Sequence, residues 1–278
     1  RVLFRSKNGQ NRHIRISLAY VIMIILIWIP MARRKSLAFL DVGQGDCFVA
    51  DTKSGAIIFD GGSSSEDQVG RYRILPYMKY LGYQKIQIAV ISHMDIDHYS
   101  GIKELLEMGK IKYLGLPEIP KDETMKKIIG IAKKRGTTIF YLSRGRQITT
   151  KDGSLKVLHP QKNSQMEKNV ASLVMQGKIL GYRVLLTGDV EKEGEEELLS
   201  EELERADILK AAHHGSKNST SNEFLQKVQP KQTVISCGKQ NRYGHPHLET
   251  IHRLQTYRTK IYRTDRSGAI IFFKRRDG

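Results

Sequence analysis

The chain has 278 residues, of which 46 are Lys or Arg and 29 are Asp or Glu, so its formal net charge is +17. A hydrophobic content of 40% excludes a fully disordered chain, and two Cys exclude both a disulfide-rich scaffold and a multi-cysteine zinc finger. The length suits one large domain or two small ones. The basic balance fits a polyanionic partner such as nucleic acid or a membrane surface, with solubility alone as the simpler explanation.

The first 35 residues form a basic segment with an apolar centre. They include eight Lys or Arg and no acid, and residues 16–32 (ISLAYVIMIILIWIPMA) contain no charge. A run of this length is near the lower limit for crossing hydrocarbon. We therefore predict that residues 1–35 contain one membrane-spanning segment. A signal peptide and a buried helix are the alternatives.

The flanking charges predict the orientation of this segment. Five cations precede the apolar run and three follow it, which favours an N-terminus inside the cell and a catalytic domain on the extracytoplasmic side of the cell membrane. The chain also begins with Arg1 rather than Met. We therefore expect a fragment or a processed product, in which the run is either an anchor or the end of a longer membrane protein.

From residue 36 to residue 278 the sequence predicts short strands alternating with helices. Short β-rich runs that Gly and Asp separate predict strands. In chain order they lie at 37–42, 46–51, 56–60, 86–92, 111–116, 137–142, 148–158 (a hairpin), 171–176, 182–189, 208–212, 233–237, 260–264 and 269–274. Helices are expected at 69–81, from about Ser100, and at 121–135, 191–204, 221–228 and 248–257. This order predicts an α+β domain with two sheets and helices on their outer faces.

The sharpest chemical signal is the segment His93-Met94-Asp95-Ile96-Asp97-His98, which directly follows an apolar strand. In an extended segment, side chains two residues apart point the same way, so His93 and Asp95 can bind one metal ion. The chain then turns toward a helix, where Asp97 and His98 can face a second ion. A polar turn with a helix cap is the alternative, but it requires no histidines.

The chain resembles the metallo-β-lactamase superfamily, and within it the C-terminal hydrolase domain of the ComEC family of competence and DNA-uptake proteins. The resemblance runs from about Leu37 to Phe273. It rests on the motifs FLDVGQGD (39–46), FDGG (59–62), SHMDIDH (92–98), LLTGD (185–189), HHGS (213–216) and YGHPH (243–247). It implies an αββα sandwich, a site for two divalent metal ions (Mn or Zn, with Mg possible) and hydrolysis of DNA.

Further residues in these motifs complete the expected metal set. Asp189 ends a strand, and its carboxylate can bridge two ions. One histidine of the His213-His214 pair is expected to bind the second ion, and we favour His213. Asp60 is expected to accept a hydrogen bond from a ligand histidine, with a plain turn role as the alternative. The predicted metal ligands are His93, Asp95, Asp97, His98, Asp189 and His213.

Two departures from the superfamily pattern bear on the metals. Asp95 stands where the superfamily motif has its second His, as in ComEC-type domains, and this oxygen ligand shifts the preference toward manganese or magnesium relative to zinc. No clear His occupies the motif before Ser172. Asn169 is the nearest candidate and His159 a weaker one, so the first ion has fewer expected protein ligands.

The favoured mechanism is two-metal hydrolysis of a phosphodiester. Asp97 would orient the attacking water, and His245, His247 or His214 would protonate the leaving oxygen, with surface histidines or completion of the metal shell as the alternative for His245 and His247. DNA would be bound independently of sequence, because few aromatic residues interleave with the cations. The expected phosphate-binding residues are Lys210, Lys217, Lys239 and Arg242.

Two other functions remain open. The fold serves many reactions, so a phosphoesterase or lactone hydrolase with another substrate is one alternative. A membrane-tethered DNA-binding module with a vestigial metal site is the other. If the ComEC resemblance holds, the expected role is to degrade one DNA strand while the other enters the cell, in contact with other subunits or segments of an uptake channel.

Overall fold

The computed structural model describes residues 7–28, 34–166, 169–200 and 203–274. The chain divides into two compact units, Arg1–Arg34 and Lys35–Gly278. In the first unit, helix α1 covers Lys7–Trp28. Among the described residues, no helix has the length and apolar character needed to cross a membrane. Residues 29–32 of the expected span lie outside the described residues, and the span stays a prediction.

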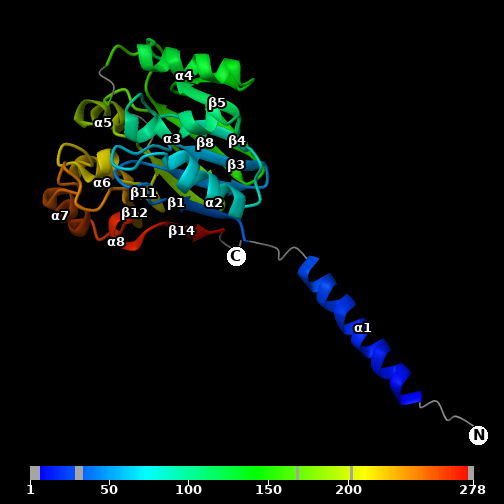
Figure 1. Cartoon of the computed structure of the whole chain (residues 1–278). Helices are drawn as coiled ribbons and strands as arrows, with labels where there is room; N and C mark the ends of the chain where they lie inside the picture. Colours follow the sequence, from blue (N-terminus) through cyan, green and yellow to red (C-terminus); the bar gives the residue numbers. More distant parts are fainter. Residues whose placement is uncertain (1–6, 29–33, 167–168, 201–202, 275–278) are drawn as a thin grey trace, which may run out of the picture. The chain divides into compact units, whose positions relative to one another are not determined.

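Two seven-stranded sheets form the second unit (Figure 1). The strands of the first sheet are, in spatial order, β14 (Ile270–Phe273), β1 (Ser36–Phe39), β2 (Phe48–Thr52), β3 (Gly55–Phe59), β4 (Ile86–Val90), β5 (Ile111–Pro117) and β6 (Thr138–Leu142). Those of the second are β13 (Lys260–Arg263), β12 (Gln232–Ile235), β11 (Ile208–Lys210), β10 (Tyr182–Leu186), β9 (Val174–Ile179), β8 (Gly153–His159) and β7 (Gln147–Thr150).

Each sheet contains an antiparallel part and a parallel part. The strands β3 to β6 run parallel to one another, as do β10 to β13. The strand β14 from the end of the chain pairs with β1 from its beginning, and Figure 1 shows the blue and red segments side by side. The register places Ser36 opposite Phe273, so the chain enters and leaves this unit at the same edge.

Helices cover the outer face of each sheet. On the first sheet they are the π-helical turn η1 (Gly70–Ile74), α2 (Leu75–Tyr80), α3 (Ile96–Glu107) and α4 (Glu123–Lys134). On the second they are α5 (Lys192–Leu199), α6 (Asn222–Val228) and α7 (Leu248–Thr256), with the short turns η2 (Ala212–Gly215) and α8 (Thr264–Ser267) beside them.

The alternation of side chains along the strands explains the layers. In β1, Leu37 and Phe39 pack into the apolar core between the two sheets, whereas Ala38 belongs to the core under α2, α3 and α4. A third core lies between the second sheet and α5 to α7. Since strands bury alternate residues on opposite faces, this is the pattern of an αββα sandwich, and the expected fold is confirmed.

The candidate functional residues follow the strand ends at one edge of the sandwich. Asp60 follows β3, His93 follows β4, Asp189 follows β10 and His213 follows β11. One boundary differs from the sequence prediction, because α3 begins at Ile96 and not near Ser100. Acidic residues stabilise the first turn of a helix, so the aspartates of the motif are compatible with this earlier start.

Candidate metal centre

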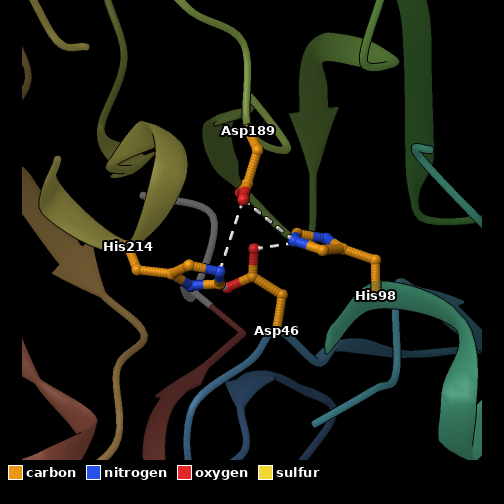
Figure 2. Close-up of side chains that lie close together, drawn as sticks. All are labelled: Asp46, His98, Asp189 and His214. Atoms are coloured by element: carbon orange, nitrogen blue, oxygen red, sulfur yellow. Dashed lines mark ion pairs between the residues drawn. The ribbon is translucent and has the colours of Figure 1, made fainter. Parts of the chain in front are cut away.

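Four buried side chains meet at this edge. Asp46, His98, Asp189 and His214 each offer one ligand atom, and these atoms all lie within 4.8 Å of one another. Figure 2 shows them pointing toward a common centre. They come from both sheets: Asp46 from the loop between β1 and β2 and His98 from the first turn of α3, Asp189 from the end of β10 and His214 from η2.

The histidine rings are held so that one nitrogen of each faces the centre. His98 Nδ1 donates to Asp60 Oδ2 at 3.0 Å, and His214 Nδ1 donates to the carbonyl oxygen of Ser236 at 2.9 Å. The Nε2 atoms of His93, His98 and His214 are buried and have no hydrogen-bond partner. Metal-binding histidines have this arrangement, with the second nitrogen hydrogen-bonded and the first directed at the ion. The residues therefore fit a divalent metal.

The carboxylates of the centre also favour a bound cation. Burial alone would lower the pKa values of His98 and His214, but the carboxylate of Asp189 outweighs burial and raises the first well above its usual value and the second to about 10. Burial would likewise raise the pKa of Asp189, but the charges of His214 and His98 hold it well below its usual value. The acids thus favour positive charge at this position, which a bound metal ion would supply.

Lys210 does not lie where the sequence analysis expected it. Its side chain is buried, with 4% of its surface exposed, and its ammonium group contacts Asp46 and lies 3.4 Å from Asp189 Oδ1. It also donates to the carbonyl oxygen of Gly188 at 2.8 Å. An ammonium group that two buried carboxylates and a carbonyl surround is not available to DNA phosphates. The prediction of phosphate binding by Lys210 is therefore corrected, and the residue neutralises carboxylates of the metal centre.

A cavity of about 330 Å³ opens onto the centre. Asp97 Oδ2 lies 3.4 Å from His214 Nε2. Burial would raise the pKa of Asp97, but the neighbouring imidazoles of His214 and His98 lower it to about 2. Asp95 Oδ2 lies 3.7 Å from His93 Nε2, so these two residues form a second pair, in which His93 is buried and Asp95 is half-buried. The cavity is lined by Gln44, Asp95, Ile96, Asp97, Asn169, Asp189, His213, His214, Tyr243 and His245.

The two histidines of the HHGS motif point in different directions. His214 is the one that joins the metal cluster, whereas His213 Nδ1 lies 2.9 Å from Glu191 Oε1 and its Nε2 lies 3.9 Å from Asp189 Oδ2. Both residues have positive φ angles, 47° and 52°. The structure thus favours His214 over the expected His213 as the ligand. From the sequence, His214 was instead expected to protonate the leaving oxygen.

His245 and His247 lie at the mouth of the same region. The ring of His245 is 5.5 Å from that of His213 and 4.9 Å from that of His247, measured between centroids. Burial and the charges of His214 and His213 lower the pKa of His245 to about 4. His247 Nδ1 accepts a hydrogen bond from the backbone N–H of Lys217 at 3.2 Å. His245 thus borders the cavity, while His247 is engaged with the neighbouring loop.

Other candidates lie apart from the metal cluster. His159 is buried at the end of β8, where its Nε2 donates to the carbonyl oxygen of Val170 at 2.7 Å and its Nδ1 lies 3.3 Å from Glu197 Oε2. It therefore does not supply the missing ligand. The guanidinium of Arg242 stacks on the ring of Tyr243, which lines the cavity. Lys239 is exposed close by in sequence.

The sequence analysis missed Asp46. Asp46 is the last residue of the motif FLDVGQGD, which could have identified it. An acidic residue in a Gly-rich turn is, however, common in loops that bind no metal. Close packing fixes it in place: its N–H donates to the carbonyl of Asp97 at 3.0 Å, and its own carbonyl accepts from Gly62 at 3.1 Å. A Cβ on Gly62 would lie 2.5 Å from the carbonyl oxygen of Ile96, so only glycine permits this approach.

Comparison with known proteins identifies the class of this fold and site. The model of the metallo-beta-lactamase superfamily matches residues 40–239. The chain belongs to this superfamily, whose members are typically metal-dependent hydrolases that bind divalent ions, most often zinc. The family predicted from the sequence is thereby confirmed.

Its relatives include proteins named for competence. ComE operon protein 3 of Bacillus subtilis is 35% identical and covers 93% of this chain, and competence protein ComA of Neisseria gonorrhoeae is 30% identical over 86%. Recombination protein 2 of Haemophilus influenzae is 29% identical over 83%. The chain spans 35%, 32% and 28% of these relatives, about a third of their lengths. It is thus a metallo-beta-lactamase-fold hydrolase domain related to competence proteins.

Solved structures agree on the fold. The metallo-beta-lactamase fold protein YhfI of Bacillus subtilis has a TM-score of 0.56 at 14% identity, covering 85% of this chain and 99% of its own. The short form of human tRNase Z has a TM-score of 0.50 at 13% identity, covering 86% and 99%. At these identities the likeness supports the shared architecture alone.

Proposed function

We propose that this domain is a metal-dependent phosphodiesterase that degrades DNA during DNA uptake. The observation that carries the proposal is the set of three buried imidazole Nε2 atoms without hydrogen-bond partners, from His93, His98 and His214, beside the carboxylates of Asp97 and Asp189. These groups border an open cavity in a chain whose relatives are named for competence and recombination.

We propose that the centre takes two divalent ions. Asp46, His98, Asp189 and His214 surround one position, and Asp97 lies against the same group. His93 and Asp95 offer donors for the other, with Asn169 lining the same cavity. The share of carboxylate oxygens suits manganese and also admits magnesium, whereas the imidazoles suit zinc.

The protein's own groups prepare the reaction in distinct ways. Bound divalent ions would polarise the phosphoryl oxygen and lower the pKa of an attacking water. Asp60 fixes the ring of His98 through Nδ1. Asp97, whose pKa of about 2 keeps it ionised at neutral pH, lines the cavity and would orient the water. His245 lies at the mouth of the cavity, where it would exchange a proton with the departing oxygen.

The setting of the domain is part of the proposal. The net charge of +17 favours a polyanionic substrate, and the exposed Lys239 and Arg242 lie close in sequence to the cavity residue Tyr243, where they would hold phosphates without reading bases. We propose that residues 16–32 tether the domain to the cell membrane with its active site on the extracytoplasmic side. Other segments or subunits of a DNA-uptake channel would be its partners.

The test is cleavage of DNA by the full chain with manganese and then with a chelator. Expected is degradation of DNA of any sequence that both the chelator and Asp97→Ala abolish. A matched control is Asp122→Asn, since Asp122 caps α4 and takes no part in the metal cluster. Turnover of a lactone or a phosphocholine ester instead of DNA would reassign the substrate. Retention of DNA at low salt without turnover would indicate a binding module.

A further inference from the structure

The edge of the sandwich opposite the metal centre is strongly basic. It contains the starting ends of the parallel strands β3 to β6, the end of α4 and the turns of three hairpins. The exposed or half-buried cations there, which we call the basic end, are Lys53, Lys85, Lys110, Lys112, Lys133, Lys134, Arg135, Lys151 and Lys178. Both the strand register and the loop contacts bring these residues to one edge.

Backbone contacts join the loops that carry the lysines. Ile86, at the start of β4, donates its N–H to the carbonyl of Lys110 at 2.7 Å, and Thr137, just after the end of α4, donates its hydroxyl to the carbonyl of Ile111 at 2.8 Å. The turn at Lys53 reaches the turn at Lys151, whose N–H donates to Ser54 Oγ at 3.0 Å. The cations of both hairpins and of α4 therefore share one continuous surface.

Acids at this end are largely engaged by neighbours. Asp51 is buried and lies 2.7 Å from the ammonium group of Lys35. The side chain of Asp152 is 1% exposed and lies 3.4 Å from that of Lys274. Glu107, at the end of α3, lies 3.8 Å from Lys103. The net field of the edge is therefore positive. On the second sheet the corresponding strand starts carry both signs, as the pair of Lys231 and Asp207 shows.

Exposed aromatic residues accompany the cations. Tyr80, at the end of α2, is 70% exposed, and Phe273, at the end of β14, is 49% exposed. Phe273 pairs with Ser36, the residue where the chain enters the domain from the apolar segment. Tyr83, which follows α2, contacts Asp51 and Lys35 through its hydroxyl. Basic side chains with aromatic neighbours, at the point where an apolar segment joins, are the composition of a surface that meets lipid headgroups.

We propose that the basic end binds the anionic surface of a lipid bilayer and holds the metal centre away from it. The strand β4 has five residues, so the two ends of the sandwich are at least roughly 17 Å apart at about 3.3 Å per residue. A DNA strand bound at the basic end would lie far from the groups that cut it. The choice of the bilayer rests on the membrane tether proposed at residues 16–32, because the chain preceding Lys35 joins the domain at this end.

The test measures binding of the full chain to vesicles of phosphatidylcholine with and without phosphatidylglycerol. The apolar segment contributes equally to binding in both cases. The increase in vesicle affinity on adding phosphatidylglycerol, which we call the gain, therefore measures the contribution of charge. Each lysine near an anionic surface contributes about five-fold. The substitutions K110Q/K112Q/K134Q should reduce the gain by about a hundred-fold, and high salt should remove it in the unmodified chain.

A matched triple substitution tests whether position matters. K162Q/K192Q/K227Q removes the same charge from exposed lysines on other loops and helices, and it should leave most of the gain intact. Equal losses in the two triples, or no gain in the unmodified chain, would overturn the proposal. Acetylation of lysines in the presence of vesicles or of DNA oligonucleotides adds a second readout. Vesicles should protect Lys110 and Lys112, and equal protection by DNA would overturn the assignment to lipid.

Discussion

Lys210 places an ammonium group between the two carboxylates of Asp46 and Asp189. Removing one partner of a buried ion group leaves the other charges uncompensated. We expect Lys210→Met to lower the free energy of unfolding of the metal-free protein by about 3–5 kcal/mol. Manganese should restore more stability to this variant than to the unmodified chain, because a divalent ion replaces the missing positive charge. Urea unfolding with and without the metal measures both effects.

Lys231 provides the control for this substitution. Its ammonium group lies 2.9 Å from Asp207, but 64% of its side chain is exposed. Exposed ion pairs contribute about 1 kcal/mol or less, so Lys231→Met should change the stability little and should not respond to manganese. Equal losses in the two variants would show that the burial of Lys210 does not set its importance.

Asp60 holds the ring of His98 at the candidate metal centre. Its carboxylate accepts from His98 Nδ1 at 3.0 Å and from the N–H of Ser92 at 2.7 Å. Asp60→Asn keeps the shape and removes the charge that orients the ring, so we expect the affinity for manganese to fall about 10- to 100-fold. Titration calorimetry measures the change. Asp122→Asn should leave the metal affinity as it was, and an unchanged affinity in Asp60→Asn would contradict the assigned role.

The place of His98 in the cluster was predictable because the HMDIDH motif brings several metal-binding side chains directly after an apolar strand. Asp189 was predictable because it ends an apolar strand. The choice between His213 and His214 could not be predicted from the sequence. Both residues adopt positive φ angles, so the directions of their side chains follow neither the helical nor the strand period. Lys210 was misassigned because a lysine beside ligand motifs is usually exposed, whereas here the carboxylates draw it into the interior.

At the scale of elements, the FDGG turn controls the position of α3. A Cβ on Gly62 would lie 2.6 Å from Asp97 C and from His98 N. Gly62→Ala should therefore push the first turn of α3 away, lower the stability by about 1–3 kcal/mol and weaken metal binding. Thermal unfolding and manganese titration test both consequences together.

Gly130 is the matched control within α4. A Cβ there would have no neighbour within 4 Å, and alanine is a better helix former than glycine by about 0.5–1 kcal/mol. Gly130→Ala should therefore raise the unfolding midpoint and leave metal affinity unchanged. A loss of stability in this variant would show that the effect at Gly62 is a general response to added methyl groups.

The strands were predictable because many of them are buried on both faces, which leaves short, continuous apolar runs in the sequence. The parallel strands β4 and β5 lie within one residue or two of their expected ends. The start of α3 could not be predicted, because the HMDIDH motif interrupts the apolar period that would mark a helix. The pairing of β14 with β1 was also invisible in the sequence, since contacts between the two ends of a chain leave no local signal.

For the whole molecule, the net charge of +17 predicts how DNA binding responds to salt. Binding by phosphate contacts releases counterions, so the logarithm of the affinity should fall linearly with the logarithm of the salt concentration. Unrelated DNA sequences should give the same slope. Filter binding in the presence of a chelator separates this binding from cleavage. A strong preference for one sequence at constant salt would contradict nonspecific contact.

The metal centre draws its side chains from both halves of the sandwich. His98 follows the first sheet, whereas Asp189 and His214 follow the second. An ion held by all three would therefore connect the two layers at the edge where Lys210 of the second sheet already contacts Asp46 of the first. Separation of the layers and release of the ion would then be a single event, so chelation should speed amide hydrogen exchange at this edge more than at the opposite one.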